Sequence, residues 1–349
     1  MDIDRRLLLG GMIAGGAMAV AGSAGAAEPG VSDTPLPRLL DNHRVIVDTD
    51  PGNDDAIAIM MALSAPNLKV EAITVCPGNL DYDQELRNAL YTVQVCGQAN
   101  RVPVHAGVRR PLLNITYPHA NFIHGKYGLG NLDVPEVAQK PDPEHAVNAI
   151  IRIVRQYPGE VVILALGGLT NVATAILMDP EIATMIKGVQ FVAGAGGAVP
   201  GFNVLADPEA AHIVLTSGVP FVLGLGGPND TILTPADFDH IKTFNTERSR
   251  FFMASNELRL TFEMSARNAP GAVNGDPMAT ALIIDPSIGE QFKAIYARVE
   301  LEGEYTRGAI LYGENRYSLA PTPPANANLC TKANNGKFKQ LLFRTLQQA

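Results

Sequence analysis

Residues 44–65 read RVIVDTDPGNDDAIAIMMALSA, an apolar run, a polar turn and a second, longer apolar run. The β-branched run before the turn is typical of a buried strand, and the segment after Pro51-Gly52 is typical of a helix. A buried strand that leads directly into a helix is the unit from which parallel sheets are built. This stretch therefore predicts an α/β fold.

The same alternation continues along the chain. Without an internal repeat or an inter-domain linker to interrupt it, we expect a single α/β domain over 41–349, with a mainly parallel sheet and helices on both faces. The expected strands, each with the helix that follows it, are KVEAITV (69–75) with 80–96, EVVILAL (160–166) with TNVATAILM (170–178), VQFVAGA (189–195) with DPEAAHIVLTSG (207–218), and VPFVLGL (219–225) with a helix begun by Thr234-Pro235.

The N-terminus differs from the rest of the chain. Arg5-Arg6 precedes an uncharged segment rich in Leu, Gly and Ala, which ends in the small residues Ala24-Gly25-Ala26. This pattern predicts a twin-arginine signal peptide over 1–26 and a Pro-containing linker over 27–40; the alternative is an uncleaved membrane anchor. We expect a periplasmic or secreted protein with no stable membrane association after cleavage.

The composition argues against nucleic acid as a partner and against a disulfide framework. The 349 residues are 46% hydrophobic and 18% charged, with a net charge of −8 and no Lys/Arg-rich run, so nucleic acid is not an expected partner. Cys76, Cys96 and Cys330 form no metal-spaced set and predict no disulfide framework. We expect two of them to be buried and one to be a surface thiol.

DTDPGNDDA (48–56) places four carboxylates within eight positions at the end of a strand. Helix capping explains one or two of them, because Asp54 and Asp55 fall in a first helical turn. Ligands of parallel α/β sheets bind outside the carboxyl ends of the strands, where this cluster lies. Two chemistries remain: an aspartyl-phosphatase with Asp48 as nucleophile and Asp50 as acid, or a hard-cation site that activates water. An EF-hand is excluded, since Ile59 stands where its closing glutamate belongs.

Further motifs follow in an order that resembles the inosine–uridine-preferring nucleoside hydrolases, from about Arg44 to near the C-terminus. The resemblance implies a Rossmann-like nucleoside hydrolase fold and the hydrolysis of ribonucleosides to ribose and free base, as in purine or pyrimidine salvage. The motifs are DTDPGNDDA, the Asn of PGN (Asn79), HGKYGLG (124–130), LGGLTN (166–171), GFN and DPEAAH (201–212), and NGDPMATALIIDP (274–286).

The resemblance also implies roles for individual residues. A Ca²⁺ ion would be held by Asp50, Asp55, Asp276 and the carbonyl of Leu166, and Asp50 would take a proton from the attacking water. Asp54, Asn79 and Asn203 would bind the ribose hydroxyls. Oxygen ligands of this kind suit Ca²⁺ independently of the family. We expect a small nucleoside as substrate and a homo-oligomer, either a dimer or a tetramer.

Two glycines depart from the family pattern. Gly275 stands where the family usually has a histidine that protonates the leaving base, and Gly201 stands where a glutamate would bind the ribose 5′ hydroxyl. His124 is our candidate for the missing acid, and Asn274, beside the metal aspartate, is a candidate substrate ligand. The alternative to an enzyme is a non-catalytic or altered-specificity Ca²⁺-dependent ribosyl-binding protein.

Overall fold

The computed structural model describes residues 43–113, 119–194, 199–224, 229–312 and 323–348, which all belong to one compact unit, Thr34–Ala349. The predicted signal peptide and linker lie outside these residues. Among the described helices, none is both long enough and apolar enough to cross a membrane.

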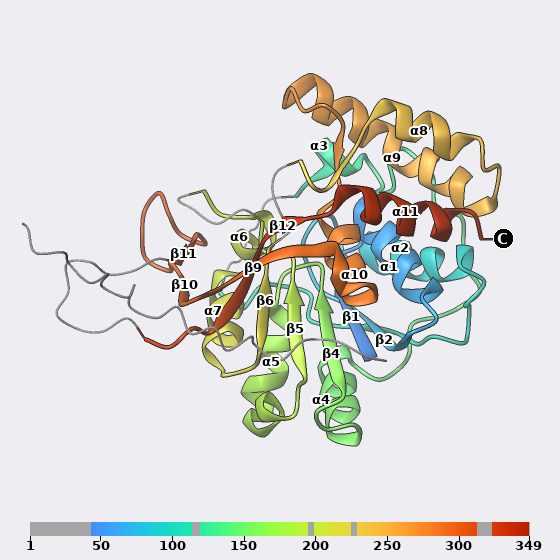
Figure 1. Ribbon diagram of the computed structural model, residues 1–349. Coiled ribbons are helices and arrows are strands. Elements are labelled where there is room, and N and C mark those ends of the chain that lie inside the picture. The colour runs from blue at the N-terminus through green and yellow to red at the C-terminus, as the bar shows by residue number, and fades with distance from the viewer. Residues whose placement is uncertain (1–42, 114–118, 195–198, 225–228, 313–322, 349) are drawn as a thin grey trace, which may run out of the picture. The chain divides into compact units, whose positions relative to one another are not determined.

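An eight-stranded sheet forms the centre of this unit, in the order β3-β2-β1-β4-β5-β6-β12-β9 (Figure 1). Neighbouring strands are parallel except β12 and β9, so the predicted mainly parallel sheet is confirmed. The strands are β1 (His43–Thr49), β2 (Leu68–Val75), β3 (Val104–Ala106), β4 (Val161–Ala165), β5 (Gly188–Phe191), β6 (Phe221–Leu223), β9 (Gly289–Ile295) and β12 (Ala327–Ala333); two small antiparallel pairs are β7 (Ile232–Leu233) with β8 (Ala272–Val273) and β10 (Ala297–Val299) with β11 (Ile310–Tyr312).

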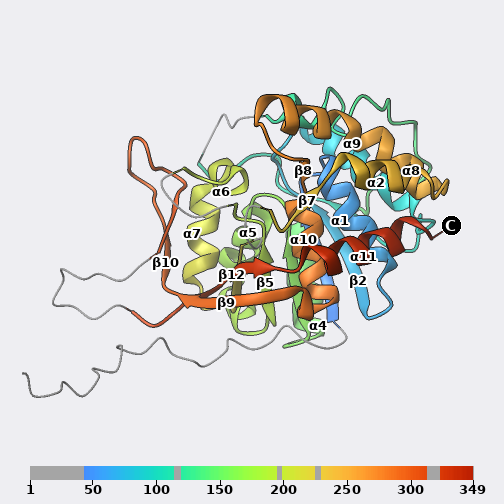
Figure 2. The same cartoon turned by 45° about the horizontal axis from the view of Figure 1, so that its top comes forward.

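Helices cover both faces of the sheet, as expected (Figures 1 and 2). They are α1 (Asn53–Ser64), α2 (Tyr82–Val95), α3 (Asn121–His124), α4 (Ala146–Gln156), α5 (Thr170–Met178), α6 (Phe202–Ala206), α7 (Pro208–Thr216), α8 (Pro235–Lys242), α9 (Glu247–Ala266), α10 (Gly275–Ile284) and α11 (Asn335–Leu346), with short 3₁₀ turns η1 (Pro180–Thr184) and η2 (Pro286–Ile288). Ile46 of β1 packs in the core with α4, α5 and α7, whereas Val45 and Val47 pack with α1 and α2. Successive residues of a strand point to opposite faces, which explains the continuous apolar runs.

Three strands of the sheet were not predicted. β3 has only three residues, and β9 is largely exposed, so neither has a long apolar run in the sequence. β12 has buried residues only at its first, fourth and last positions, and it ends the parallel order by pairing antiparallel with β9. The expectation of one surface thiol is wrong: Cys76, Cys96 and Cys330 are all buried and form no disulfide.

The register of the strands brings the polar motifs to one edge of the sheet. Thr49 at the end of β1 pairs with Val75 at the end of β2, and Asp48 pairs with Ala165 at the end of β4. The residues that follow each strand therefore leave the sheet at the same level. These are the segments that contain Asp50, Asn79 and Leu166.

Candidate functional site

The turn from β1 into α1, together with the first turn of that helix, contains three closely spaced aspartates. Asp50 follows β1, Gly52 is the N-cap of α1, and Asp54 and Asp55 lie in the first turn of that helix. Asp276 lies in the first turn of α10, which packs against α1. Carboxylate oxygens of Asp54, Asp55 and Asp276 lie within 4.8 Å of one another, and all three side chains are buried. Segments more than two hundred residues apart thus form one acidic cluster.

Asp50 lies beside this cluster with its carboxylate enclosed. Both carboxylate oxygens are buried, and neither has a hydrogen-bond partner among the described residues. A Cβ atom at Gly78 would lie 1.7 Å from Asp50 Oδ2, and one at Gly167 would lie 2.6 Å from Oδ1. Only glycine leaves room for the carboxylate at these two positions. Buried carboxylate oxygens without a donor fit a metal ion, because leaving them unpaired is costly.

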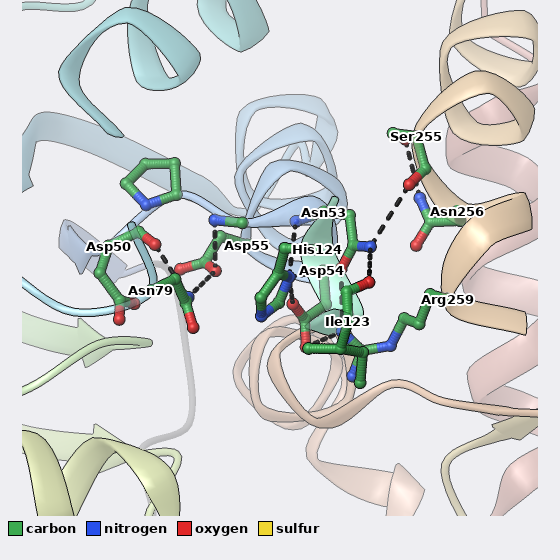
Figure 3. Close-up of polar contacts among 12 residues, drawn as sticks. Asp50, Asn53, Asp54, Asp55, Asn79, Ile123, His124, Ser255, Asn256 and Arg259 are labelled. Atoms are coloured by element: carbon green, nitrogen blue, oxygen red, sulfur yellow. Dashed lines mark hydrogen bonds and ion pairs between the residues drawn. The ribbon is translucent and has the colours of Figure 1, made fainter. Parts of the chain in front are cut away.

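Asp55 is held in place by the residues around it. Its Oδ1 accepts a hydrogen bond from Thr49 Oγ1 (2.6 Å), and its Oδ2 accepts from the backbone N–H of Gly52 (2.9 Å) and from Asn79 Nδ2 (3.3 Å). Asn79 Nδ2 also donates to the backbone carbonyl of Asp50 (2.9 Å; Figure 3). Asn79 therefore joins the turn after β2 to the acidic cluster.

The cluster resists ionisation in the absence of a cation. Burial raises the pKa of Asp50 and of Asp276 well above the usual range, and the charges of neighbouring aspartates raise both further. Burial and the charge of Asp54 raise the pKa of Asp55 to about 6. A bound divalent cation reverses this balance, because it stabilises the ionised form of each ligand. The electrostatics of the site therefore favour a cation.

Asp54 has a partner that sequence reasoning missed. Arg259 of α9 is buried, and its Nη1 lies 2.9 Å from Asp54 Oδ2. Asp54 Oδ1 is buried without a hydrogen-bond partner among the described residues. Arg259 lies in a segment without a recognisable motif, so only the packing of α9 against α1 reveals it. With one oxygen paired to Arg259, Asp54 has one oxygen left for a ligand.

His124 lies at the end of α3, against the start of α1. Its Nδ1 is 2.8 Å from Asn53 Oδ1 and 3.7 Å from Asp54 Oδ1. A Cβ atom at Gly52 would lie 2.5 Å from the ring, so the imidazole packs directly on the backbone of the turn. Burial lowers the pKa of His124 to about 4, and the ring is neutral at pH 7. The structure thus places His124 beside Asp54, as a neutral ring rather than the charged acid.

The other predicted ligands are brought to the same edge, with their amides already engaged. Asn203 Nδ2 donates to the carbonyl of Leu166, the predicted cation ligand, and to the carbonyl of Val192 (2.9 Å). Asn274 Nδ2 donates to the carbonyl of Ala272 (2.8 Å), and its Oδ1 is buried without a partner among the described residues. The second lone pair of a carbonyl remains available to a cation, and the amide oxygens remain available as acceptors.

Asp48 supports the site from within the sheet. Its Oδ1 accepts hydrogen bonds from Thr74 Oγ1 of β2 (2.6 Å) and from Asn171 Nδ2 of α5 (2.8 Å). Burial raises its pKa to about 7.

A second buried carboxylate, Glu85 of α2, accepts from the backbone N–H of Leu80 (2.8 Å) and so restrains the turn that carries Asn79. Sequence reasoning did not single out Glu85.

The two glycines that depart from the family pattern lie at helix starts. Gly275 is the first residue of α10 and is buried. Gly201 is the N-cap of α6, and a Cβ atom there would lie 1.8 Å from the carbonyl oxygen of Ala193. This backbone therefore accepts no side chain at position 201. Residues 195–198, in the same loop, lie outside the described residues.

Comparison with known sequences finds relatives along most of the chain. A sequence model of the family described as inosine-uridine preferring nucleoside hydrolase matches residues 45–340. An enzyme of that description from Leishmania major is 34% identical over 315 residues, covering 88% of this chain and 98% of the relative. One from Crithidia fasciculata is 35% identical over 273 residues (76% and 86%). A probable uridine nucleosidase from Arabidopsis thaliana is 32% identical over 283 residues (79% and 87%).

Comparison with solved structures finds the same class of protein. A plant nucleoside hydrolase superposes with a TM-score of 0.82 at 29% identity, covering 88% of this chain and 100% of that chain. A purine-preferring ribonucleoside hydrolase from Gardnerella vaginalis gives 0.79 at 28% identity, with the same coverage of both chains. The similarity in fold thus extends over most of this chain and over the whole of both solved structures.

Proposed function

Because this chain belongs to the inosine-uridine preferring nucleoside hydrolase family, we propose that a Ca²⁺ ion for ribonucleoside hydrolysis binds between Asp50 and the Asp55 and Asp276 members of the acidic cluster. The enzyme hydrolyses the N-glycosidic bond of ribonucleosides, as do its relatives. The named relatives are hydrolases or nucleosidases, which favours this activity over the ribosyl-binding and phosphatase alternatives. The ligands we propose are Asp50, Asp55, Asp276 and the carbonyl of Leu166.

One observation carries the proposal: both oxygens of Asp50 are buried and have no hydrogen-bond partner among the described residues. Two glycines, Gly78 and Gly167, make room for that carboxylate, so its position is built into the backbone. Carboxylate and carbonyl oxygens are the ligands that Ca²⁺ prefers. A cation held there would supply a Lewis acid that lowers the pKa of water and would help to position the ribose hydroxyls.

Each residue of the site then has a separate role in the reaction. We assign Asp50 as the base that accepts the proton of the attacking water, because its oxygens are not engaged by any donor in the described chain. Asp54, paired with Arg259 through one oxygen, accepts from a ribose hydroxyl through the other. We assign Asn79, Asn203 and Asn274, whose amide nitrogens donate to backbone carbonyls, as acceptors for substrate hydroxyls through their amide oxygens. The surrounding carboxylates stabilise the positive charge that develops on the ribose as the bond breaks.

Cell location and assembly are also proposals. The twin-arginine pattern over 1–26 supports export to the periplasm or outside the cell, and no stable membrane association after cleavage. Twin-arginine export of a folded chain would let the cation be bound before transport. We further propose a homo-oligomer, a dimer or tetramer, with a small nucleoside as substrate and no nucleic acid partner.

Ca²⁺ titration of the chelator-stripped protein by calorimetry tests the proposed ligands. Asp276→Asn removes one charged ligand, so we expect Ca²⁺ affinity to fall by about tenfold or more, because ligand charge tunes affinity. Asp285→Asn is the matched control: Asp285 ends the same helix, and its Oδ1 accepts from the backbone N–H of Ser287, which an asparagine also does. Equal affinity of Asp276→Asn and wild type would contradict the assignment.

A further inference from the structure

The side chain of Asn53, in the middle of DTDPGNDDA, connects α1 to two other helices, α3 and α9 (Figure 3). Its Nδ2 lies 3.3 Å from the backbone carbonyl of Ile123 and 3.3 Å from that of Ser255. Both neighbours are acceptors, and an amide nitrogen only donates. These two carbonyls therefore fix which end of the Asn53 amide is nitrogen.

The oxygen end of the amide faces two nitrogen atoms. Asn53 Oδ1 lies 2.9 Å from Arg259 Nη1 and 2.8 Å from His124 Nδ1. A guanidinium has donors only, so Arg259 confirms the orientation independently of the two carbonyls. The flipped amide would place its nitrogen against the guanidinium and its oxygen against two carbonyl oxygens. Asn53 Oδ1 is thus an acceptor held in front of the His124 ring.

This acceptor decides where His124 carries its proton. Without a proton on Nδ1, two lone pairs would face each other across 2.8 Å. The competing arrangement has Nδ1 accept from the backbone N–H of Asn53, which is farther away, at 3.3 Å. Asp54 Oδ1, 3.7 Å from the same nitrogen, also favours a proton there. The shorter contact and the nearby carboxylate both place the proton on Nδ1.

We propose that Asn53 is a positioning residue that holds His124 in the Nδ1–H tautomer, so that Nε2 carries no proton and is a hydrogen-bond acceptor. Protonation of the ring to its positively charged form is disfavoured, because the charged Arg259 guanidinium binds the same amide oxygen and because His124 is buried. The role of proton donor to the leaving base then belongs to another group, and His124 accepts from a hydroxyl or N–H group of the nucleoside. This inference rests on the proposed function.

Selective ¹⁵N labelling of histidine and two-bond ¹H–¹⁵N spectra of the full-length protein at pH 7 test the tautomer directly. The His124 signal is identified by its loss in His124→Gln. We expect Nδ1 to be protonated and Nε2 unprotonated, whereas a free neutral imidazole prefers the proton on Nε2. A proton on Nε2 in the wild type overturns the inference without any variant.

Two substitutions, Asn53→Leu and Asn256→Leu, distinguish a positioning role of Asn53 from a role in packing alone. Asn53→Leu removes the acceptor, so the signal should move toward the Nε2–H tautomer and kcat/KM should fall by about tenfold or more, as for other supporting partners of a site. An unchanged tautomer in Asn53→Leu overturns the inference.

The matched control is Asn256→Leu on α9, because Asn256 Nδ2 donates only to Phe252 and Ser255 among the described contacts. Its His124 tautomer should be that of the wild type. Ribose release by the wild type distinguishes this inference from the proposed function. Activity with a proton on Nε2 refutes the inference alone, and the Nδ1–H tautomer without hydrolysis of any ribonucleoside refutes the proposed function.

Discussion

Asp48 shows how a single buried carboxylate couples stability to pH. It accepts hydrogen bonds from Thr74 and Asn171 through Oδ1, while its Oδ2 has no partner in the described chain. Burial raises its pKa from the usual 3.8 to about 7. Between these two pH values the folded protein binds a proton that the unfolded chain has released. The contribution of Asp48 to stability is therefore full below about pH 4 and is lost as the pH rises through about 7.

Asp48→Asn should abolish this part of the pH dependence. In the metal-free protein, the difference between the free energies of unfolding at pH 4 and pH 8 should shrink by up to about 4 kcal/mol, the equivalent of about three pKa units. Urea unfolding of both proteins in the presence of chelator measures that difference. Identical pH profiles for Asp48→Asn and wild type would show that Asp48 is already ionised in the folded protein.

At the scale of elements, the turns that follow β2 and β4 determine the shape of the site. Gly78 and Gly167 belong to these turns, and each lies against the carboxylate of Asp50. The neighbouring Gly168 differs, because a Cβ atom there would lie 3.6 Å or more from its nearest neighbours, an ordinary contact distance. An alanine should therefore be tolerated at position 168 and not at the adjacent position 167.

Gly167→Ala should impair the enzyme, and Gly168→Ala should not. The new methyl group at position 167 pushes on Asp50 and on Cys76 Sγ, both 2.6 Å away, so we expect kcat/KM for ribonucleosides to fall by about a hundredfold, as expected when a catalytic group is misplaced. Steady-state kinetics of the two variants, with circular dichroism to verify folding, makes the comparison. Equal losses in both variants would contradict the account of this turn.

The elements also show what the sequence could predict. β1, β2, β4 and β5 contain apolar runs, and the helices after them are apolar or amphipathic, so each was predicted, although the end of β5 was placed at residue 195 rather than at Phe191. β3, β9 and β12 were missed because they are short or partly exposed, and their pairing depends on neighbours distant in sequence. Arg259 was missed for a related reason: α9 brings it to Asp54, and nothing in its own segment marks a site.

At the scale of the whole molecule, the sheet assembles a site from segments that the sequence keeps far apart. The parallel register brings the ends of β1, β2 and β4 to one edge, and α10 packs on α1 to add Asp276. The share of the acidic cluster that lies in DTDPGNDDA could be predicted from that stretch, because its charge density is local, whereas Asp276 was predicted only from the family resemblance. The amide contacts of Asn203 and the state of His124 could not, since they depend on burial and on three-dimensional neighbours.

Ribose release from ribonucleosides tests the central claim, a Ca²⁺-dependent hydrolysis that uses Asp50. The wild-type rate should be lost after chelation and should return with added Ca²⁺. Asp50→Asn should be at least about a hundredfold slower at saturating Ca²⁺, the usual effect of losing a general base; Asp285→Asn should match the wild type. A chelated wild type that keeps its full rate, or an Asp50→Asn variant as fast as wild type, would contradict the account.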